Sequence, residues 1–242
     1  MSIAKRIIDA LKDVKWEEKS QSEIDAKKLE FAALKISVPL LVPVAKHFLR
    51  NELTGPGGHA KDELAKRMFD HYLDEDGKLF VLTLDDMKAM NANGIDIRNK
   101  DTSTVNPDFA VACSKAKAAG TAQDYSGKLH WVWDNGSIAN YTVHYAGQIT
   151  AAGGVCKWEG VVDYFDRFDL DPRWGWTPSN PQGRSRGGER RTRIGYILDL
   201  GTDYDVKSPK ARTWQRETDK AITFDGTIVA GSTPTAPSAG DL

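Results

Sequence analysis

The sequence predicts an α+β fold, with helices in the first part of the chain and an antiparallel sheet in the second. Two observations support this class. Residues 1–92 repeat apolar residues at helical spacing, and residues 128–228 alternate apolar and polar residues in short runs between turns. The 242 residues, 40% of them hydrophobic, are enough for a substantial core. Residues 93–127 are expected to connect the two regions, and residues 229–242 form a tail rich in Pro, Ser, Thr and Gly that we expect to be disordered.

The helical region is expected to contain several amphipathic helices in succession. Ser2 and the sequence SEID, which begins at Ser22, are capping signals for the first two. The breaker TGPGG at residues 54–58 separates the third from the fourth. A short strand is expected at residues 79–82, and one small helix in the connecting segment at residues 109–118. The predicted helices of the first region span residues 2–13, 22–35, 44–52, 59–74 and 83–90.

Strands are expected where β-branched and aromatic residues gather or alternate with polar ones. Leu129 and Trp131 alternate with His130 in this way, and Asp134-Asn135-Gly136 is a hairpin-turn signal. The run from Asp203 to Asp205 is interpreted as a turn. The predicted strands span residues 129–133, 137–150, 155–165, 193–200, 213–216 and 221–228.

The composition excludes several classes of function. A net charge of −1 argues against a nucleic-acid-binding protein. The first residues contain acids and no long apolar core, so no secretory signal peptide is expected. The longest apolar run, residues 36–45, is interrupted by two prolines and is too short for a transmembrane segment. We therefore expect a protein made in the cytoplasm without a signal peptide.

The cysteines and histidines give no metal-binding pattern. Cys113 and Cys156 are too few for a disulfide framework and fit a protein folded in a reducing cytosol, although one bridge between them remains open. The chain has no Cys-x-x-Cys, and its histidines show no pair at helical metal-binding spacing, so a structural zinc site is not expected. His130 and His144 are interpreted as ordinary histidines on facing strands.

The most unusual stretch is the loop at residues 163–193, which joins two predicted strands. Acidic residues are followed by arginines, and no lysine occurs between Lys157 and Lys207. Arginine suits two-pronged contacts with carboxylate or phosphate oxygens, whereas lysine offers a point charge. One interpretation is a solvated acidic turn paired with a solvated basic loop, and the other is a functional site. The residues concerned are Asp163, Asp166, Asp169, Asp171, Arg173, Arg184, Arg186, Arg190, Arg191 and Arg193.

Asp166 and Asp169 are three residues apart near the end of a predicted strand, where Asp171-Pro172 interrupts the strand and a turn could bring the two carboxylates together. Two neighbouring carboxylates raise one another's pKa or hold a divalent cation. Arginines opposite them would bind phosphoryl oxygens. This set of groups suits hydrolysis of a phosphate ester or pyrophosphate, with one carboxylate orienting water.

The same stretch resembles the activity domain of colicin M-type bacteriocins, which cleave the peptidoglycan precursor lipid II. The matching residues are Gly160-Val161-Val162, then Asp166-Arg167-Phe168-Asp169 in place of an Asp-x-Tyr-Asp motif, and Thr192-Arg193-Ile194-Gly195. A helix and a Gly-containing turn over residues 44–58 are similar as well, so the likeness covers roughly residues 40–205. Phe168 replaces the family's tyrosine, and no histidine follows His144.

The resemblance implies a helical layer packed on an open, half-barrel-like sheet, and Mg²⁺-dependent cleavage between undecaprenol and pyrophosphate. It implies that Asp166 and Asp169 are catalytic and hold the Mg²⁺, with Arg184 as a third catalytic residue. The residues expected to bind the substrate are Arg186, Phe168 and Arg193.

We therefore expect an antibacterial toxin or effector that hydrolyses a lipid-linked pyrophosphate such as lipid II in the periplasm of a target cell and blocks peptidoglycan synthesis. A component of a secretion machine and an immunity protein are the expected protein partners. One alternative is a different hydrolase that uses Asp203 and Asp205. Another is a non-enzymatic effector that keeps the colicin M-like fold and binds a protein or membrane target through a tryptophan-rich sheet. The tryptophans are Trp131, Trp133, Trp158, Trp174 and Trp176.

Overall fold

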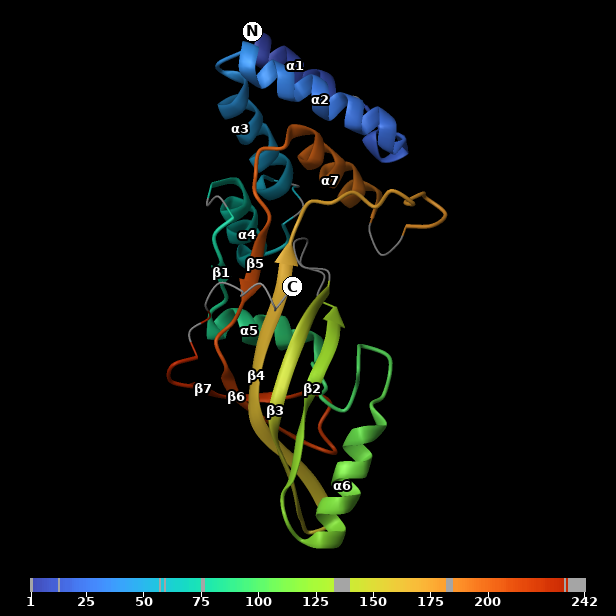
Figure 1. Ribbon diagram of the computed structural model, residues 1–242, viewed down its shortest axis with the longest axis vertical. Helices are drawn as coiled ribbons and strands as arrows, with labels where there is room; N and C mark the ends of the chain where they lie inside the picture. The colour runs from blue at the N-terminus through green and yellow to red at the C-terminus, as the bar shows by residue number, and fades with distance from the viewer. Residues whose placement is uncertain are drawn as a thin grey trace. The chain divides into compact units, whose positions relative to one another are not determined.

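The computed structural model describes residues 2–12, 14–56, 58, 60–74, 77–132, 140–181, 185–232 and 234. Within this part of the chain, seven α-helices and an open, seven-stranded sheet confirm the predicted α+β class (Figure 1). The chain divides into two compact units. Unit 1 comprises Met1–Lys78, Asn135–Ser137 and Phe168–Tyr204, and unit 2 comprises Leu79–Asp134, Ile138–Arg167 and Asp205–Leu242.

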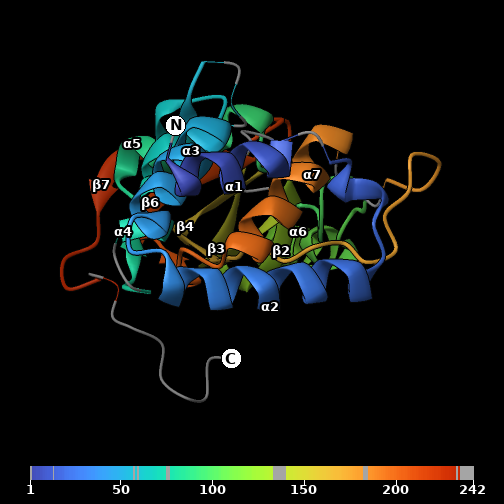
Figure 2. The ribbon, with the colours of Figure 1, turned by 90° about the horizontal axis from the view of Figure 1, so that it is seen from above.

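Unit 1 is a group of helices around an aliphatic and aromatic core. The second helix opens with a capping box, in which the Ser20 hydroxyl accepts from the Glu23 backbone N–H and the Glu23 carboxylate accepts from the Ser20 N–H. The helix at Arg186–Leu198 (α7) packs against those at Gln21–Ser37 (α2) and Leu41–Thr54 (α3) (Figure 2). The helices are α1 (Ile3–Lys12), the 3₁₀ helix η1 (Trp16–Glu18), α2 (Gln21–Ser37), α3 (Leu41–Thr54), α4 (Glu63–Asp74) and α7 (Arg186–Leu198).

Helix α7 overturns the prediction of a strand at residues 193–200. The Ser185 hydroxyl caps the helix by accepting from the Gly188 N–H, and Glu189 and Arg193 form an ion pair one turn apart. Ile194 and Ile197 are both buried, at a helical spacing of three residues. The β-branched residues that favoured a strand therefore serve the buried side of a helix, because tertiary packing outweighs local propensity.

Unit 2 is organised on the sheet, whose strand order is β1-β5-β4-β3-β2, with β6 paired to β4 and β7 to β6. β1 and β5 are parallel, so the sheet is mixed and not antiparallel throughout as predicted. β5 also occupies the segment that was interpreted as a turn. The strands are β1 (Phe80–Val81), β2 (Gln123–Val132), β3 (Asn140–Ala152), β4 (Val155–Phe168), β5 (Tyr204–Lys207), β6 (Ala211–Arg216) and β7 (Thr223–Ile228).

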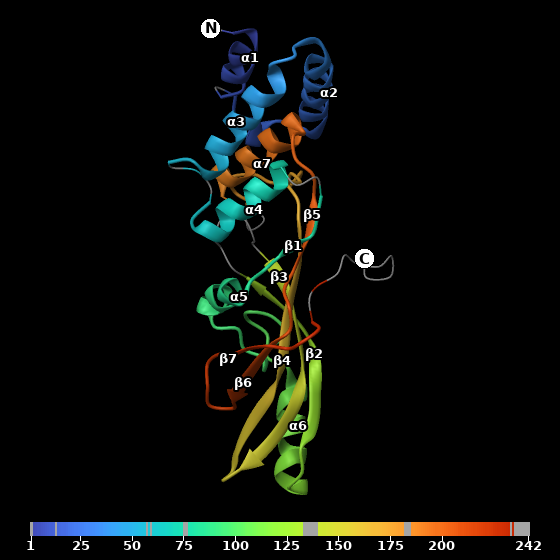
Figure 3. The ribbon, with the colours of Figure 1, turned by 90° about the vertical axis from the view of Figure 1, so that its left-hand side faces the viewer.

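Helix α6 (Pro107–Ala119) covers one face of β2 and β3 (Figure 3), while α5 (Leu84–Met90) and the 3₁₀ helix η2 (Asn91–Asn93) complete the unit. On the covered face Gly147 lies opposite Gly160, where an added Cβ at Gly160 would come within 2.3 Å of a backbone oxygen. The two strands therefore approach closely at this point. The ring of Trp158 lies beside Gly160, and the ring of Tyr145 stacks on that of Tyr125 with centroids 5.1 Å apart.

The predictions for the connecting segment, the hairpin turn and the tail have different outcomes. The connecting segment contains α6, as expected, but β2 begins at Gln123, inside that segment. The hairpin turn at residues 134–136 lies outside the described residues, as does most of the tail at residues 229–242. Among the described helices, none combines the length and the apolar composition that crossing a bilayer requires.

Candidate functional site

The two motif aspartates lie where β4 ends. Side chains of β4 alternate, so Asp166 shares the face of the buried Val162 and Tyr164 and is itself half-buried. Asp169 is the first residue after the strand, is half-buried, and accepts the Asp171 N–H on Oδ1 at 3.2 Å. Asp166 belongs to unit 2 and Asp169 to unit 1. Asp166 thus lies near the end of β4 and Asp169 directly after the strand, and their joint role in catalysis stays a prediction.

Phe168, expected to bind substrate, is 3% exposed and packs in an aromatic cluster of unit 1. Its ring stacks on that of Tyr204 at a centroid distance of 5.0 Å, and it meets the Phe69 ring edge-on at 5.4 Å. Tyr72 completes the cluster at 5.7 Å. In this arrangement the side chain contributes apolar packing to unit 1.

Arg193, also expected to bind substrate, is 1% exposed. Its Nε donates to Oε1 of Glu189 at 2.6 Å, and Nη1 donates to the backbone oxygens of Trp16 and Lys19 at 3.0 and 2.6 Å. Nη2 donates to the backbone oxygen of Arg173 at 3.2 Å. The guanidinium thus ties η1 and the loop before α7 to α7 itself, with its charge balanced inside the unit.

Arg186 and Arg184, the other two arginines expected in the site, differ from Arg193 in burial and in what is described of them. The Nε of Arg186 donates to the buried Glu17 at 2.7 Å, and the same guanidinium pairs with Glu18, while the side chain stays 51% exposed. These two carboxylates raise the pKa of Arg186, and the hydrogen bond to Glu17 is the largest cause. Arg184 lies outside the described residues. Arg186 therefore keeps an accessible guanidinium, although it already holds two carboxylates.

Asp169 and Asp171 belong to a set of acids near Tyr72 in unit 1. Burial raises the pKa of the Tyr72 hydroxyl well above its usual value, and the carboxylates of Asp203 and Asp199, followed by those of Asp171 and Asp169, raise it further. Carboxylate oxygens are the donors that Mg²⁺ takes, usually one or two from the protein together with substrate phosphates and water. Asp166 and Asp169 fit that mode of binding by their chemistry.

On the face of the sheet opposite α6, three polar residues of neighbouring strands lie side by side, an arrangement that the sequence did not indicate. The strand register places Lys128 of β2 opposite His144 of β3, and His144 opposite Asp163 of β4. His144 Nδ1 and Asp163 Oδ2 are 3.3 Å apart, within hydrogen-bonding distance. Asp163 also lines a hollow of about 450 Å³ with Lys207 and Lys210. The contact joins residues 19 positions apart, so only the register reveals it.

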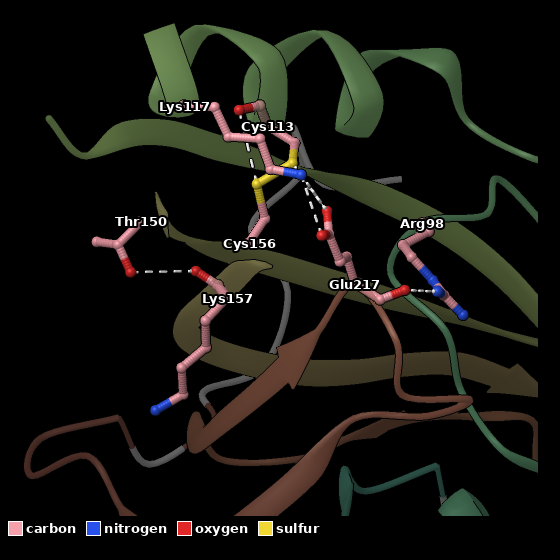
Figure 4. Close-up of a disulfide and its surroundings, with 7 residues drawn as sticks. All are labelled: Arg98, Cys113, Lys117, Thr150, Cys156, Lys157 and Glu217. Carbon is pink, nitrogen blue, oxygen red and sulfur yellow. Dashed lines mark hydrogen bonds and ion pairs between the residues drawn. A yellow bond between two sulfur atoms is a disulfide. The ribbon is translucent and has the colours of Figure 1, made fainter. Parts of the chain in front are cut away.

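The two cysteines form a disulfide between α6 and β4 (Figure 4). Of the two interpretations that the sequence left open, the single bridge is the one that the structure contains. Oε2 of Glu217 lies 3.1 Å from Sγ of Cys113, and the Lys117 ammonium donates to both Glu217 oxygens at 3.0 and 3.1 Å. Within the described residues, Cys113, Cys156 and Glu217 are the group of three side chains close enough to share a metal ion.

No protein-family model matches the sequence, and no curated protein matches it either. Two solved structures are weakly similar. The crystal structure of the bacteriocin syringacin M from Pseudomonas syringae pv. tomato DC3000 has a TM-score of 0.37 and 15% identity, over 63% of this chain and 52% of that chain. A mutant of the same bacteriocin has a TM-score of 0.33 and 14% identity, over 78% of each chain. The first match thus spans about half of the syringacin M chain.

Proposed function

We propose that the chain is an antibacterial toxin domain that hydrolyses a lipid-linked pyrophosphate, such as lipid II, in the periplasm of a target cell. The observation that carries the proposal is the run Asp166-Arg167-Phe168-Asp169 at the end of β4, after Gly160-Val161-Val162, with both aspartates half-buried. This is the run on which the resemblance to colicin M-type bacteriocins rests. Catalytic side chains are often carried by loops that a rigid scaffold positions, and carboxylates are among the groups that act as general bases.

In the proposed reaction Asp166 orients a water molecule and accepts its proton, and Asp169 assists it. Mg²⁺, when bound to these carboxylates and to the substrate, would neutralise charge on the pyrophosphate. Arg184 and Arg186 bind phosphoryl oxygens, for which a guanidinium is well shaped. Water cleaves the link between undecaprenol and pyrophosphate and leaves a free polyprenol and a pyrophosphoryl-disaccharide. Arg193 acts differently: it fixes the loop before α7 through its contacts with Glu189 and Arg173.

The disulfide gives independent support for action outside the cytoplasm. A bridge between Cys113 and Cys156 persists in an oxidising compartment such as the periplasm and is rare in a reducing cytosol. Export by a secretion machine and a cognate immunity protein in the producing cell belong to the same proposal.

The test is incubation of the purified, oxidised protein with lipid II and Mg²⁺, with chromatographic detection of undecaprenol and the pyrophosphoryl-disaccharide. We expect both products, and we expect Asp166→Asn to abolish them. Asp163→Asn is the matched control, because Asp163 lies on the same strand with its side chain on the opposite face. Absence of both products, or equal activity of Asp166→Asn and the unmodified protein, contradicts the proposal.

The alternative is a non-enzymatic effector that binds a protein or membrane target. Three of the tryptophans expected to form its binding surface are buried and cannot contact such a target. Trp131 and Trp158 are 4% and 0% exposed, and Trp176 is 4% exposed, so these rings form core rather than a binding surface. Trp174 is 38% exposed, and Trp133 lies outside the described residues. Recipient-cell killing by Asp166→Ala at the level of the unmodified toxin favours this alternative over the enzyme.

A further inference from the structure

Cys113, Cys156 and Glu217 come from three separate segments of unit 2 and converge on one point. Cys113 lies on the buried side of α6, Cys156 lies in β4, and Glu217 follows β6. One potential ligand atom from each, two sulfurs and a carboxylate oxygen, lie within 4.8 Å of one another. Cys156 is fully buried and Cys113 is 6% exposed, so the sulfurs are shielded from bulk water (Figure 4).

A cationic side chain already pairs with the carboxylate of this cluster. The Lys117 ammonium lies within 3.1 Å of both Glu217 oxygens, and one of these, Oε2, is 3.1 Å from Sγ of Cys113 (Figure 4). The Glu217 carboxylate is therefore directed at a position where positive charge is stabilised. Lys117 is 40% exposed, so its long side chain can swing out to solvent and vacate that position.

The bridged sulfurs have no negative charge to offer a metal. A dithiol reductant supplies two electrons and two protons, which open the bridge to two thiols while the reductant becomes a disulfide. Each thiol then loses its proton when it binds a metal ion. Two thiolates with one carboxylate are ligands that Zn²⁺ accepts in a tetrahedral site, with water in the fourth position.

We propose that the reduced protein binds one Zn²⁺ through Cys113, Cys156 and Glu217. The disulfide and the zinc are then alternative cross-links between α6 and β4: zinc in a reducing compartment, the disulfide in an oxidising one. Unit 2 keeps the same connection in both. The ligands are separated by 43 residues, from Cys113 to Cys156, and by a further 61, from Cys156 to Glu217, which is why no sequence spacing predicts the site.

The experiment uses the full chain, reduced under anaerobic conditions and titrated with Co²⁺ as a spectroscopic probe. We expect thiolate-to-cobalt absorption in the near ultraviolet and intense visible bands of tetrahedral Co²⁺, at one equivalent, with both signals lost when Zn²⁺ is added. The oxidised chain should give neither signal. Reduced protein that shows no thiolate–cobalt absorption overturns the proposal.

Glu217→Gln keeps both thiols and removes the carboxylate charge, and we expect it to weaken Co²⁺ binding by at least about tenfold. Lys117→Met removes the competing ammonium and should tighten binding. Equal affinity of Glu217→Gln and the unmodified protein overturns the assignment of the carboxylate. If reduction loosens the fold, protection of both thiols from alkylation by added Zn²⁺, read by mass spectrometry, decides: alkylation at the same rate with and without Zn²⁺ overturns the site.

Discussion

Arg193 and Glu189 form an ion pair that is almost completely enclosed in unit 1. Nε and Oε1 are 2.6 Å apart, and the two side chains are 2% and 0% exposed. Oε1 of Glu189 also accepts the backbone N–H of Arg173 at 3.0 Å, so the carboxylate connects the helix to a residue outside it. The pair therefore joins α7 to the loop that precedes it, the segment in which a site was expected from its arginines.

Removing one member of this pair should leave the other as an uncompensated buried charge. We expect Arg193→Ala to lower the free energy of unfolding by about 3–5 kcal/mol. Chemical denaturation followed by circular dichroism measures it. Arg173→Ala, at an exposed position of the same loop, is the control, with an expected change within about 0.5 kcal/mol. Similar losses for both variants would show that the enclosed pair has no special weight.

The fate of Arg193 illustrates what the sequence could and could not reveal. Amphipathic helices and alternating strands were predictable, because their periodicity is local. Whether a particular arginine binds a ligand or its own chain depends on partners such as Trp16 and Lys19, more than 170 residues away. The helix signals at Ser185 and at the Glu189–Arg193 spacing were present, but the β-branched residues around Ile194 masked them.

The aromatic cluster around Phe168 leads to a second prediction. Phe168→Ala removes a ring that is 3% exposed and contacts Phe69, Tyr72 and Tyr204, so we expect a loss of about 3–5 kcal/mol in the free energy of unfolding. Phe165→Ala is the matched control on the other face of β4, where the ring is half-buried, and should cost less.

The role of Phe168 in substrate binding is tested separately with Phe168→Leu, which keeps the site apolar. We expect its KM for lipid II to be unchanged, since the ring faces the cluster. A large increase in KM at unchanged stability would restore the substrate-binding role that the motif implied.

The capping box of α2 makes stability depend on pH. The hydrogen bond from Lys19, followed by those from the Ser20 backbone and hydroxyl, lowers the pKa of Glu23 from 4.5 to about 2. A carboxyl group with a lower pKa in the folded state stabilises the fold above its unfolded pKa, and this contribution is lost as the pH falls towards the folded value.

We therefore expect the stability difference between the unmodified protein and Glu23→Gln to be constant above about pH 5 and to shrink between about pH 4.5 and pH 2. Denaturation of both proteins across this range measures the difference directly, so other titrating groups cancel. A difference that is independent of pH over the whole range would exclude the charged capping interaction as its source.

The disulfide restricts a loop of 43 residues in unit 2 and should stabilise that unit by limiting its unfolded state. The loop-entropy relation gives about 4 kcal/mol for a loop of this length. With a chelator present to exclude metal, we expect reduction to speed amide hydrogen exchange in β3 and β4, by up to about 800-fold if exchange proceeds through opening of the whole unit.

The double variant Cys113→Ser, Cys156→Ser should show the same faster exchange without reductant. Helix α2 of unit 1 is the internal control, because its residues lie outside the loop and should exchange at unchanged rates. Unchanged protection of β3 and β4 after complete reduction would mean that packing alone, through Phe109 and Ala116 of α6, holds the helix on the sheet.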